Sequence, residues 1–384
     1  MIVIKGGNLH LNTGEVKKAD ILIEGTNIKK IGNDIDPEGV QSIDAAGKEV
    51  FAGFIEPCTG LGLRDYTNLT QMDNNEISDP CAPHLNVKYS LDRREILRQQ
   101  YYYTGITSFG ASPGANNIIS GQMGVYHTAG PSIKEMCLKE FAAVKGDFTM
   151  DVKRTYGMRG LPPMTKMSMA WMLKDALRAA KDYIESGEAL YNPKNESLAK
   201  VLKGEVPLLI NAASATEIKS VIEITAEFDL PLVLSGVYQA KECVDEIIER
   251  KIPVVLGQPH IMGFPAPYGT DYTAVSDLLA EGIPVGLTSG GDSVLGGREI
   301  LLWSAFKLRQ EGFASADVEK MISYNNAVIL GVEGLTGALE EGKLADIVVY
   351  DGHPLETFES RVAWQFVAGT VVHEGNGGFE RCFI

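Results

Sequence analysis

Cysteine, histidine and long apolar segments are all scarce in this chain of 384 residues. The five cysteines are odd in number and contain no CxxC pair, so neither a disulfide framework nor a zinc finger is indicated. No apolar run reaches the roughly 18 residues that a transmembrane helix needs, and the first residues lack the pattern of a signal peptide. We therefore expect a soluble, cytoplasmic protein.

Positively charged residues are also fewer than negatively charged ones. Lysine and arginine number 35 against 50 aspartates and glutamates, which gives a net charge of −15. Such a chain repels nucleic-acid phosphates and anionic lipids, so we expect neither nucleic acid nor membrane as a partner. The phosphate-binding motif GxxxxGK[ST] and the serine-hydrolase motif GxSxG are absent too. These absences argue against a nucleotide-binding protein and a serine hydrolase.

The pattern of apolar and turn residues differs between the two ends of the chain and its middle. Short β-branched runs, separated by turn residues, occupy both ends and predict a small β-sandwich domain built from residues 1–50 and 338–384. In residues 51–337, apolar runs alternate with helical patterns, as in βα units. That length suits a (β/α)8 barrel, which takes about 250 residues. The expected fold class is α/β, a TIM-like barrel plus a terminal β domain.

The expected barrel strands are residues 51–55, 107–109, 208–210, 232–234, 253–256 and 284–287. The expected helices are residues 90–103, 168–186, 215–228, 240–250, 272–281, 299–311 and 316–330.

Several segments resemble the amidohydrolase superfamily. They are ILIEG at residues 21–25, DAAGK at 44–48, AGFIE at 52–56 and GKLADIVV at 342–349 followed by HPL at 353–355. Within the superfamily the chain is most similar to the imidazolonepropionase-like branch, on NIISGQ at 117–122 and KRTYG at 153–157. The resemblance implies a barrel that holds one or two divalent ions, commonly zinc, which activate water for hydrolysis.

The ligands that the resemblance implies are mostly missing. Cys58 and Gly60 stand where a His-x-His pair is expected after the first strand, and Met150 stands where this branch often has a glutamate. Ala213 and Ser235 replace the histidines expected after strands five and six. Asp292 remains near strand eight, two residues later than an ungapped match puts it. The expectation is therefore a lost metal centre, with no bound metal and no other cofactor.

Six histidines are available as alternatives. His10, His353 and His373 lie in the expected β domain, where we assign them surface or turn roles. His84, His127 and His260 lie in loops after expected strands, which gather at the mouth of a barrel. Each has the plainer interpretation of a loop histidine bonded to backbone.

Two hypotheses follow. The first is a degenerate amidohydrolase that acts as a non-catalytic subunit, in a homo-oligomer or beside an active homologous amidohydrolase, or that binds a small molecule. The second is an active hydrolase of cyclic amides with an atypical site, with zinc or another divalent ion if a metal remains. In it Asp292 is the general base, His260 a substrate or oxyanion contact and Lys145 a charge anchor, with Cys58 beside them. For Cys58 a buried filler, and for Lys145 a solvated side chain, remain the alternatives.

Overall fold

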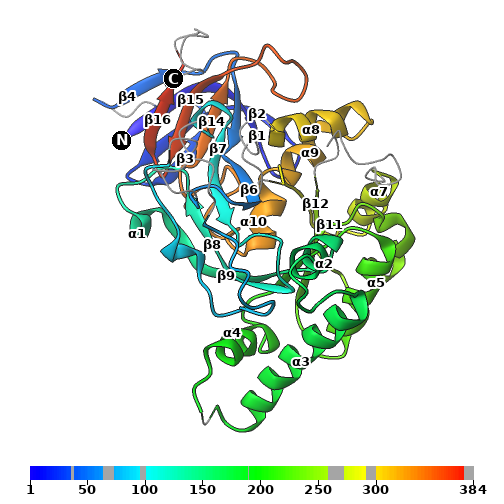
Figure 1. Cartoon of the computed structure of the whole chain (residues 1–384). Helices are drawn as coiled ribbons and strands as arrows, with labels where there is room; N and C mark the ends of the chain where they lie inside the picture. Colours follow the sequence, from blue (N-terminus) through cyan, green and yellow to red (C-terminus); the bar gives the residue numbers. More distant parts are fainter. Residues whose placement is uncertain are drawn as a thin grey trace.

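The structure is a computed structural model with two eight-stranded sheets (Figure 1). It describes residues 1–35, 39–63, 73–95, 101–188, 190–257, 272–290 and 300–375.

The first sheet, here called the terminal sheet, combines both ends of the chain. Its strands are β1 (Ile2–His10), β2 (Val16–Glu24), β3 (Asn27–Gly32), β4 (Gln41–Asp44), β5 (Glu49–Ala52), β14 (Ile347–Tyr350), β15 (Val362–Val367) and β16 (Thr370–Glu374). They lie in the order β16-β15-β14-β5-β1-β2-β3, with β4 paired to β1. The sheet is mixed, because β1 runs parallel to β4 and β5 while its other partner is antiparallel. A separate β unit built from both termini is thus confirmed.

The second sheet forms the barrel. Its strands are β6 (Phe54–Thr59), β7 (Ile106–Ala111), β8 (Ile119–His127), β9 (Cys137–Asp147), β10 (Leu208–Ala212), β11 (Leu232–Gly236), β12 (Val254–Leu256) and β13 (Val285–Leu287). They are neighbours in chain order from β6 to β13. The α/β barrel is confirmed with one difference, since β8 runs antiparallel to β7 and β9. The short helix α1 (Ile133–Met136) joins β8 directly to β9.

The remaining helices follow the barrel strands. They are η1 (Val87–Tyr89), α2 (Met150–Gly157), α3 (Lys166–Glu185), α4 (Pro193–Leu202), α5 (Ala215–Ala226), η3 (Ala240–Cys243), α6 (Val244–Glu249), α7 (Tyr272–Ala280), α8 (Ile300–Gln310), α9 (Ser315–Met321) and α10 (Tyr324–Leu330). Their starts carry recognisable caps. Thr165 accepts a hydrogen bond from the Ser168 amide at α3, and Ser214 with Glu217 forms a capping box at α5. None of the helices in the described ranges is long and apolar enough to cross a membrane.

Four expected elements need correction. The strand expected at residues 51–55 is split at Gly53, so that its first part belongs to the terminal sheet and its second part to the barrel. The helix expected at residues 316–330 is broken between α9 and α10, and 240–250 begins as a 3-10 turn. The α-helix expected at residues 90–103 is wrong at its described ends, where 90–95 form turns and loop and 101–103 a short 3-10 turn.

The α10 helix closes the barrel where β6 and β13 meet. The Asn326 side-chain amide donates to the carbonyl oxygens of Ile55 and Leu287, at 2.8 and 3.0 Å. Gly286 makes this approach possible, because a Cβ there would lie 2.1 Å from the Asn326 Oδ1 atom. One buried side chain thereby supplies donors to two strands that do not form a continuous ladder.

The terminal sheet contacts the barrel at the amino-terminal ends of the parallel strands. Gln365 of β15 donates to the Ile106 carbonyl at the start of β7, over 2.9 Å. His127, at the end of the antiparallel β8, bonds Asp346 just before β14. The carboxyl ends of the parallel strands, where barrel proteins carry their sites, therefore face away from this contact.

Candidate functional site

The interior of the barrel changes from apolar to polar along its strands. Ile55, Ala143, Leu209, Val233 and Val255 belong to one buried cluster inside the barrel. Because side chains two residues apart on a strand point to the same face, the next interior positions are the polar ones. They are Asp147, Asn211 and Ser235, which lie side by side in the sheet, together with Lys145, which lies two residues earlier on β9 beside Leu209. The candidate site is this polar layer at the carboxyl ends of the strands, here called the barrel mouth.

Asp147 and Lys145 form the centre of this layer. Asp147 is fully buried, and one of its oxygens accepts hydrogen bonds of 2.7 Å from both the amide and the hydroxyl of Thr149. Its other oxygen accepts a bond of 2.8 Å from the side-chain amide of Asn211. Burial raises the pKa of Asp147 to about 7, although the charge of Lys145 and these donors oppose the rise. The carboxyl group is held in place by the protein itself.

Lys145 differs from Asp147 in its hydrogen bonding. Its side chain is only 3% exposed, and its ammonium makes no hydrogen bond or ion pair within the described part of the chain. The nearby carboxyl group of Asp147 supplies an opposite charge. The side chain of Lys145 is thus mostly buried, and its role as a charge anchor stays a prediction.

A second carboxyl group lies where β6 meets β13. Glu56 is fully buried and accepts hydrogen bonds from the Thr288 hydroxyl and, over 2.9 Å, from the Ser289 amide. The Cys58 amide adds a longer bond of 3.4 Å. Burial raises the pKa of Glu56 to about 7, against the lowering effect of these donors. Both buried carboxyl groups of the mouth thus have their oxygens occupied by protein donors.

The predicted catalytic residues are only partly placed. Of Asp292, His260 and Lys145, the first two lie outside the described residues. Lys145 points into the barrel, and Cys58 lies at the end of β6 with its thiol 3.3 Å from the Ser112 hydroxyl. The expected convergence of Asp292 and His260 with Lys145 and Cys58 stays a prediction.

The histidines outside the mouth have clear positions. His127 was expected in a loop near the mouth, but it ends β8 and, because that strand is antiparallel, lies at the opposite end of the barrel. His373 of β16 meets the ring of Tyr103 at 4.8 Å. His10 and His353, expected as separate surface or turn residues, instead converge on Glu319.

Comparison with known proteins shows that the chain is similar to amidohydrolases. The amidohydrolase family model matches residues 212–373. The crystal structure of an amidohydrolase from Thermotoga maritima superposes with a TM-score of 0.91 and 27% identity, over 98% of this chain and all of that one. The chain has the amidohydrolase fold and is similar to an amidohydrolase along its whole length. The branch within the superfamily stays a prediction.

Two curated amidohydrolases are similar over parts of their length. Amidohydrolase tasK of Hapsidospora irregularis is 22% identical over 377 residues, which cover 88% of this chain but 38% of that protein. A dihydroorotase of Lactobacillus gasseri is 48% identical over 54 residues, 14% of this chain and 12% of the enzyme. The chain therefore spans less than half the length of these curated relatives.

Several positions at which the family resemblance implies metal ligands hold other residue types in the described part of the chain. Ala213, directly after β10, offers no ligand atom, and Ser235 is a buried hydroxyl in place of an imidazole. Met150 begins α2 with its side chain 58% exposed. Within the described ranges, one group of three side chains brings possible ligand atoms together. It consists of His10, Glu319 and His353 and lies outside the mouth. At the described strand ends of the mouth the carboxylates are Asp147 and Glu56, and each already accepts three hydrogen bonds from protein donors.

Sequence reasoning missed Glu56, Asp147, Asn211 and Thr288 as members of the polar layer. The signal for Asp147 was the spacing of alternate positions on β9, Ala143, Lys145 and Asp147. That spacing has meaning only once residues 137–147 are recognised as a strand, and they were not among the expected strands.

Proposed function

We propose that this amidohydrolase-like protein has lost the metal-dependent hydrolase centre and uses its barrel mouth to bind a small anionic molecule. The observation that supports it is the contrast between the two charged groups of β9. Asp147 accepts hydrogen bonds from Thr149 and Asn211, whereas the ammonium of Lys145, on a side chain that is mostly buried, makes no hydrogen bond in the described part of the chain. A carboxylate or another anionic group on a ligand would satisfy this ammonium.

The neighbouring groups favour binding over hydrolysis. A carboxylate ligand of a metal needs an oxygen lone pair directed at the ion, and a general base needs one directed at water. In Asp147 and in Glu56 three hydrogen bonds from protein donors already use most of the about four lone pairs of the carboxylate. The Ser235 hydroxyl on the neighbouring interior face adds a polar group that can orient a bound molecule.

The test is ligand-dependent stabilisation of the purified chain. Small carboxylates and cyclic amides are added to the wild type and to the Lys145→Met variant while the melting temperature is measured. A ligand at about a hundred times its Kd stabilises the wild type by about 2.7 kcal/mol, whereas Lys145→Met should lose that shift. Lys153→Met on α2 is the matched control, because this nearby lysine lies outside the barrel interior. Equal shifts in Lys145→Met and the wild type would contradict the proposal.

Hydrolysis is examined with the same protein. Turnover of a cyclic amide that requires added zinc or manganese, and stops with a chelator, would contradict the loss of the metal centre. A second candidate function, metal-independent hydrolysis, is favoured by the pKa of Asp147 near 7, which suits a general base. It predicts turnover that persists with chelator and is abolished by Asp147→Asn.

A further inference from the structure

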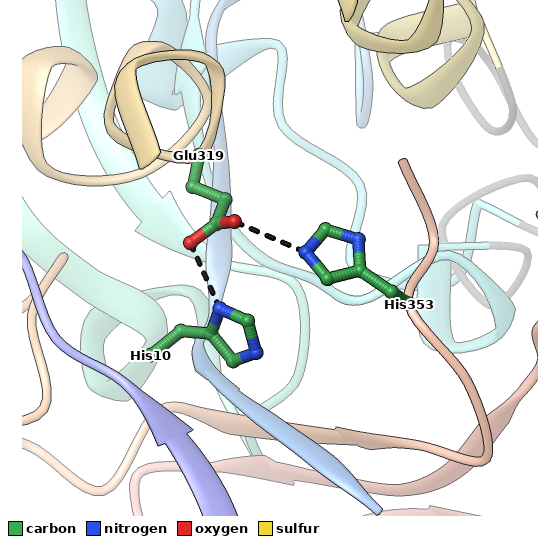
Figure 2. A group of neighbouring side chains, drawn as sticks. All are labelled: His10, Glu319 and His353. Carbon is green, nitrogen blue, oxygen red and sulfur yellow. Dashed lines mark hydrogen bonds and ion pairs between the residues drawn. The ribbon is translucent and has the colours of Figure 1, made fainter. Parts of the chain in front are cut away.

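Three side chains from distant parts of the chain converge beside the terminal sheet (Figure 2). His10 is the last residue of β1, Glu319 lies in α9, and His353 follows β14. The two oxygens of Glu319 are divided between the histidines, with Oε2 at 3.1 Å from His10 Nδ1 and Oε1 at 3.1 Å from His353 Nε2. Two imidazole rings thus point one nitrogen each at a single carboxylate.

The three side chains are sheltered and held in place by their surroundings. The exposed fractions are 6% for His10, 12% for Glu319 and 13% for His353. The ring of His10 stacks on Phe51 with centroids 4.0 Å apart, and His353 meets the same Phe51 edge-on at 5.4 Å. Because these rings are fixed by packing, the positions of their nitrogens are set before any ligand arrives.

The far side of the His10 ring carries a further contact. His10 Nε2 lies 2.7 Å from a carboxylate oxygen of Glu49 in β5. A metal-binding histidine almost always donates its second ring N–H to a carboxylate or carbonyl, which fixes the ring and makes the ligating nitrogen more basic. Glu49 is this carboxylate for His10, and the Nδ1 atom of His10 remains directed at Glu319.

The donor set and the available space suit a small ion. One ligand atom from each of the three residues lies within 4.8 Å of the others. Two imidazoles and a carboxylate are a common set for zinc, which then takes water as its fourth ligand. A cavity of about 20 Å³ borders His10 and Glu319, which is room for about one water molecule.

We propose that His10, Glu319 and His353 bind one divalent transition metal, zinc in the first place, and that this ion joins the terminal sheet to helix α9. The ion replaces the two shared protons that now lie between the imidazoles and Glu319. One contact is lost, since the Leu355 amide donates to His353 Nδ1 over 3.2 Å, and that nitrogen must carry the proton when Nε2 binds metal. This site is separate from the barrel mouth and does not depend on the function proposed there.

The test is zinc binding by the full chain after treatment with a chelator and dialysis. Calorimetric titration should show one zinc ion bound per wild-type chain, with at least tenfold weaker binding in His353→Ala. Glu49→Gln, which alters only the residue behind His10, should weaken binding by about 10- to 100-fold. His373→Ala, a histidine change in the same sheet, is the matched control and should bind zinc like the wild type.

X-ray absorption at the zinc edge identifies the ligands independently of the variants. The site predicts nitrogen and oxygen neighbours at about 2.0–2.1 Å with the scattering pattern of two imidazoles, and no sulfur at about 2.3 Å. Absence of zinc binding by the wild type, unchanged binding in folded His353→Ala, or a sulfur neighbour would each overturn the proposal. Circular dichroism of every variant establishes that it is folded before its binding is compared.

Discussion

His127 at the end of β8 contacts Asp346, just before β14, through a hydrogen bond of 3.0 Å, and both side chains are buried. This bond connects the barrel to the terminal sheet. Asp346 also accepts bonds from the Thr336 hydroxyl and the Ala368 amide, at 2.7 and 2.8 Å. Burial opposes ionisation of Asp346, but His127 and these donors outweigh it and hold the pKa of the carboxyl group below its ordinary value.

Replacing His127 with alanine should therefore destabilise the protein strongly. The change leaves a fully buried carboxylate without its strongest partner and opens a space between the two sheets. Breaking such a buried pair costs about 3–5 kcal/mol, and we expect a loss near the lower value because two donors to Asp346 remain. Urea unfolding of His127→Ala beside His373→Ala measures it. A loss no larger than in His373→Ala would show that the bond contributes little.

The Asn326 side chain offers a test of barrel closure. Asn326→Ala removes the donors from the Ile55 and Leu287 carbonyls, which are buried where β6 meets β13. Each unsatisfied buried carbonyl costs about 1–3 kcal/mol, so the loss of both bonds should lower the free energy of unfolding by about 2–6 kcal/mol. Asn195→Ala in α4 is the control, expected to change stability by less than about 0.5 kcal/mol. Equal stability of the two variants would mean that water replaces the amide.

Gly53 marks the point where the chain passes from the terminal sheet into the barrel. A Cβ at this position would lie 2.1 Å from the Thr107 Oγ1 atom and 2.4 Å from its methyl carbon, so one of the two strands must move. We expect Gly53→Ala to destabilise the protein by more than about 2 kcal/mol through overpacking. Gly157→Ala, at a helical position with nothing within 4 Å of the new carbon, should be neutral or stabilising by up to about 1 kcal/mol. Thermal unfolding of the two variants compares them directly.

Much of the fold could be predicted from the sequence because its strands are marked by composition. The apolar runs that form β10 to β13 are short, buried on both faces and separated by amphipathic helices. This pattern is typical of a parallel sheet covered by helices. The antiparallel β8 was missed because residues 119–127 contain two glycines and polar side chains and follow a loop rich in small residues. Its direction depends on pairing with β7 and β9, which no local pattern specifies.

The side-chain clusters were harder to predict than the strands. The expected replacement of family ligands at Ala213 and Ser235 rests on the resemblance of flanking motifs and stays a prediction. The convergence of His10, Glu319 and His353 could not be predicted, since each lies in an ordinary local sequence and the three meet only through the pairing of terminal strands and the packing of α9. Residues that act together through tertiary contacts carry no shared signal in one sequence.

The two carboxyl groups of the barrel mouth should make stability depend on pH in an unusual direction. Because burial raises the pKa of Glu56 from 4.5 to about 7, the native state keeps a proton that the unfolded chain has released between these values. Stability attributable to Glu56 is therefore complete below about pH 4.5, falls as the pH rises to about 7 and is constant above it. The shift corresponds to roughly 3 kcal/mol, and Asp147 acts with the same sign.

Glu56→Gln separates this contribution from the rest of the chain. Glutamine cannot ionise, so the decrease in the free energy of unfolding between about pH 4.5 and 7 should be smaller than in the wild type, with Asp147 responsible for a residual slope. At pH 5 the variant should be less stable, because one oxygen that accepts from Thr288 or Ser289 becomes an amide donor. Urea unfolding at intervals across this range measures both effects. Parallel pH profiles for the two proteins would show that Glu56 is already ionised in the native state.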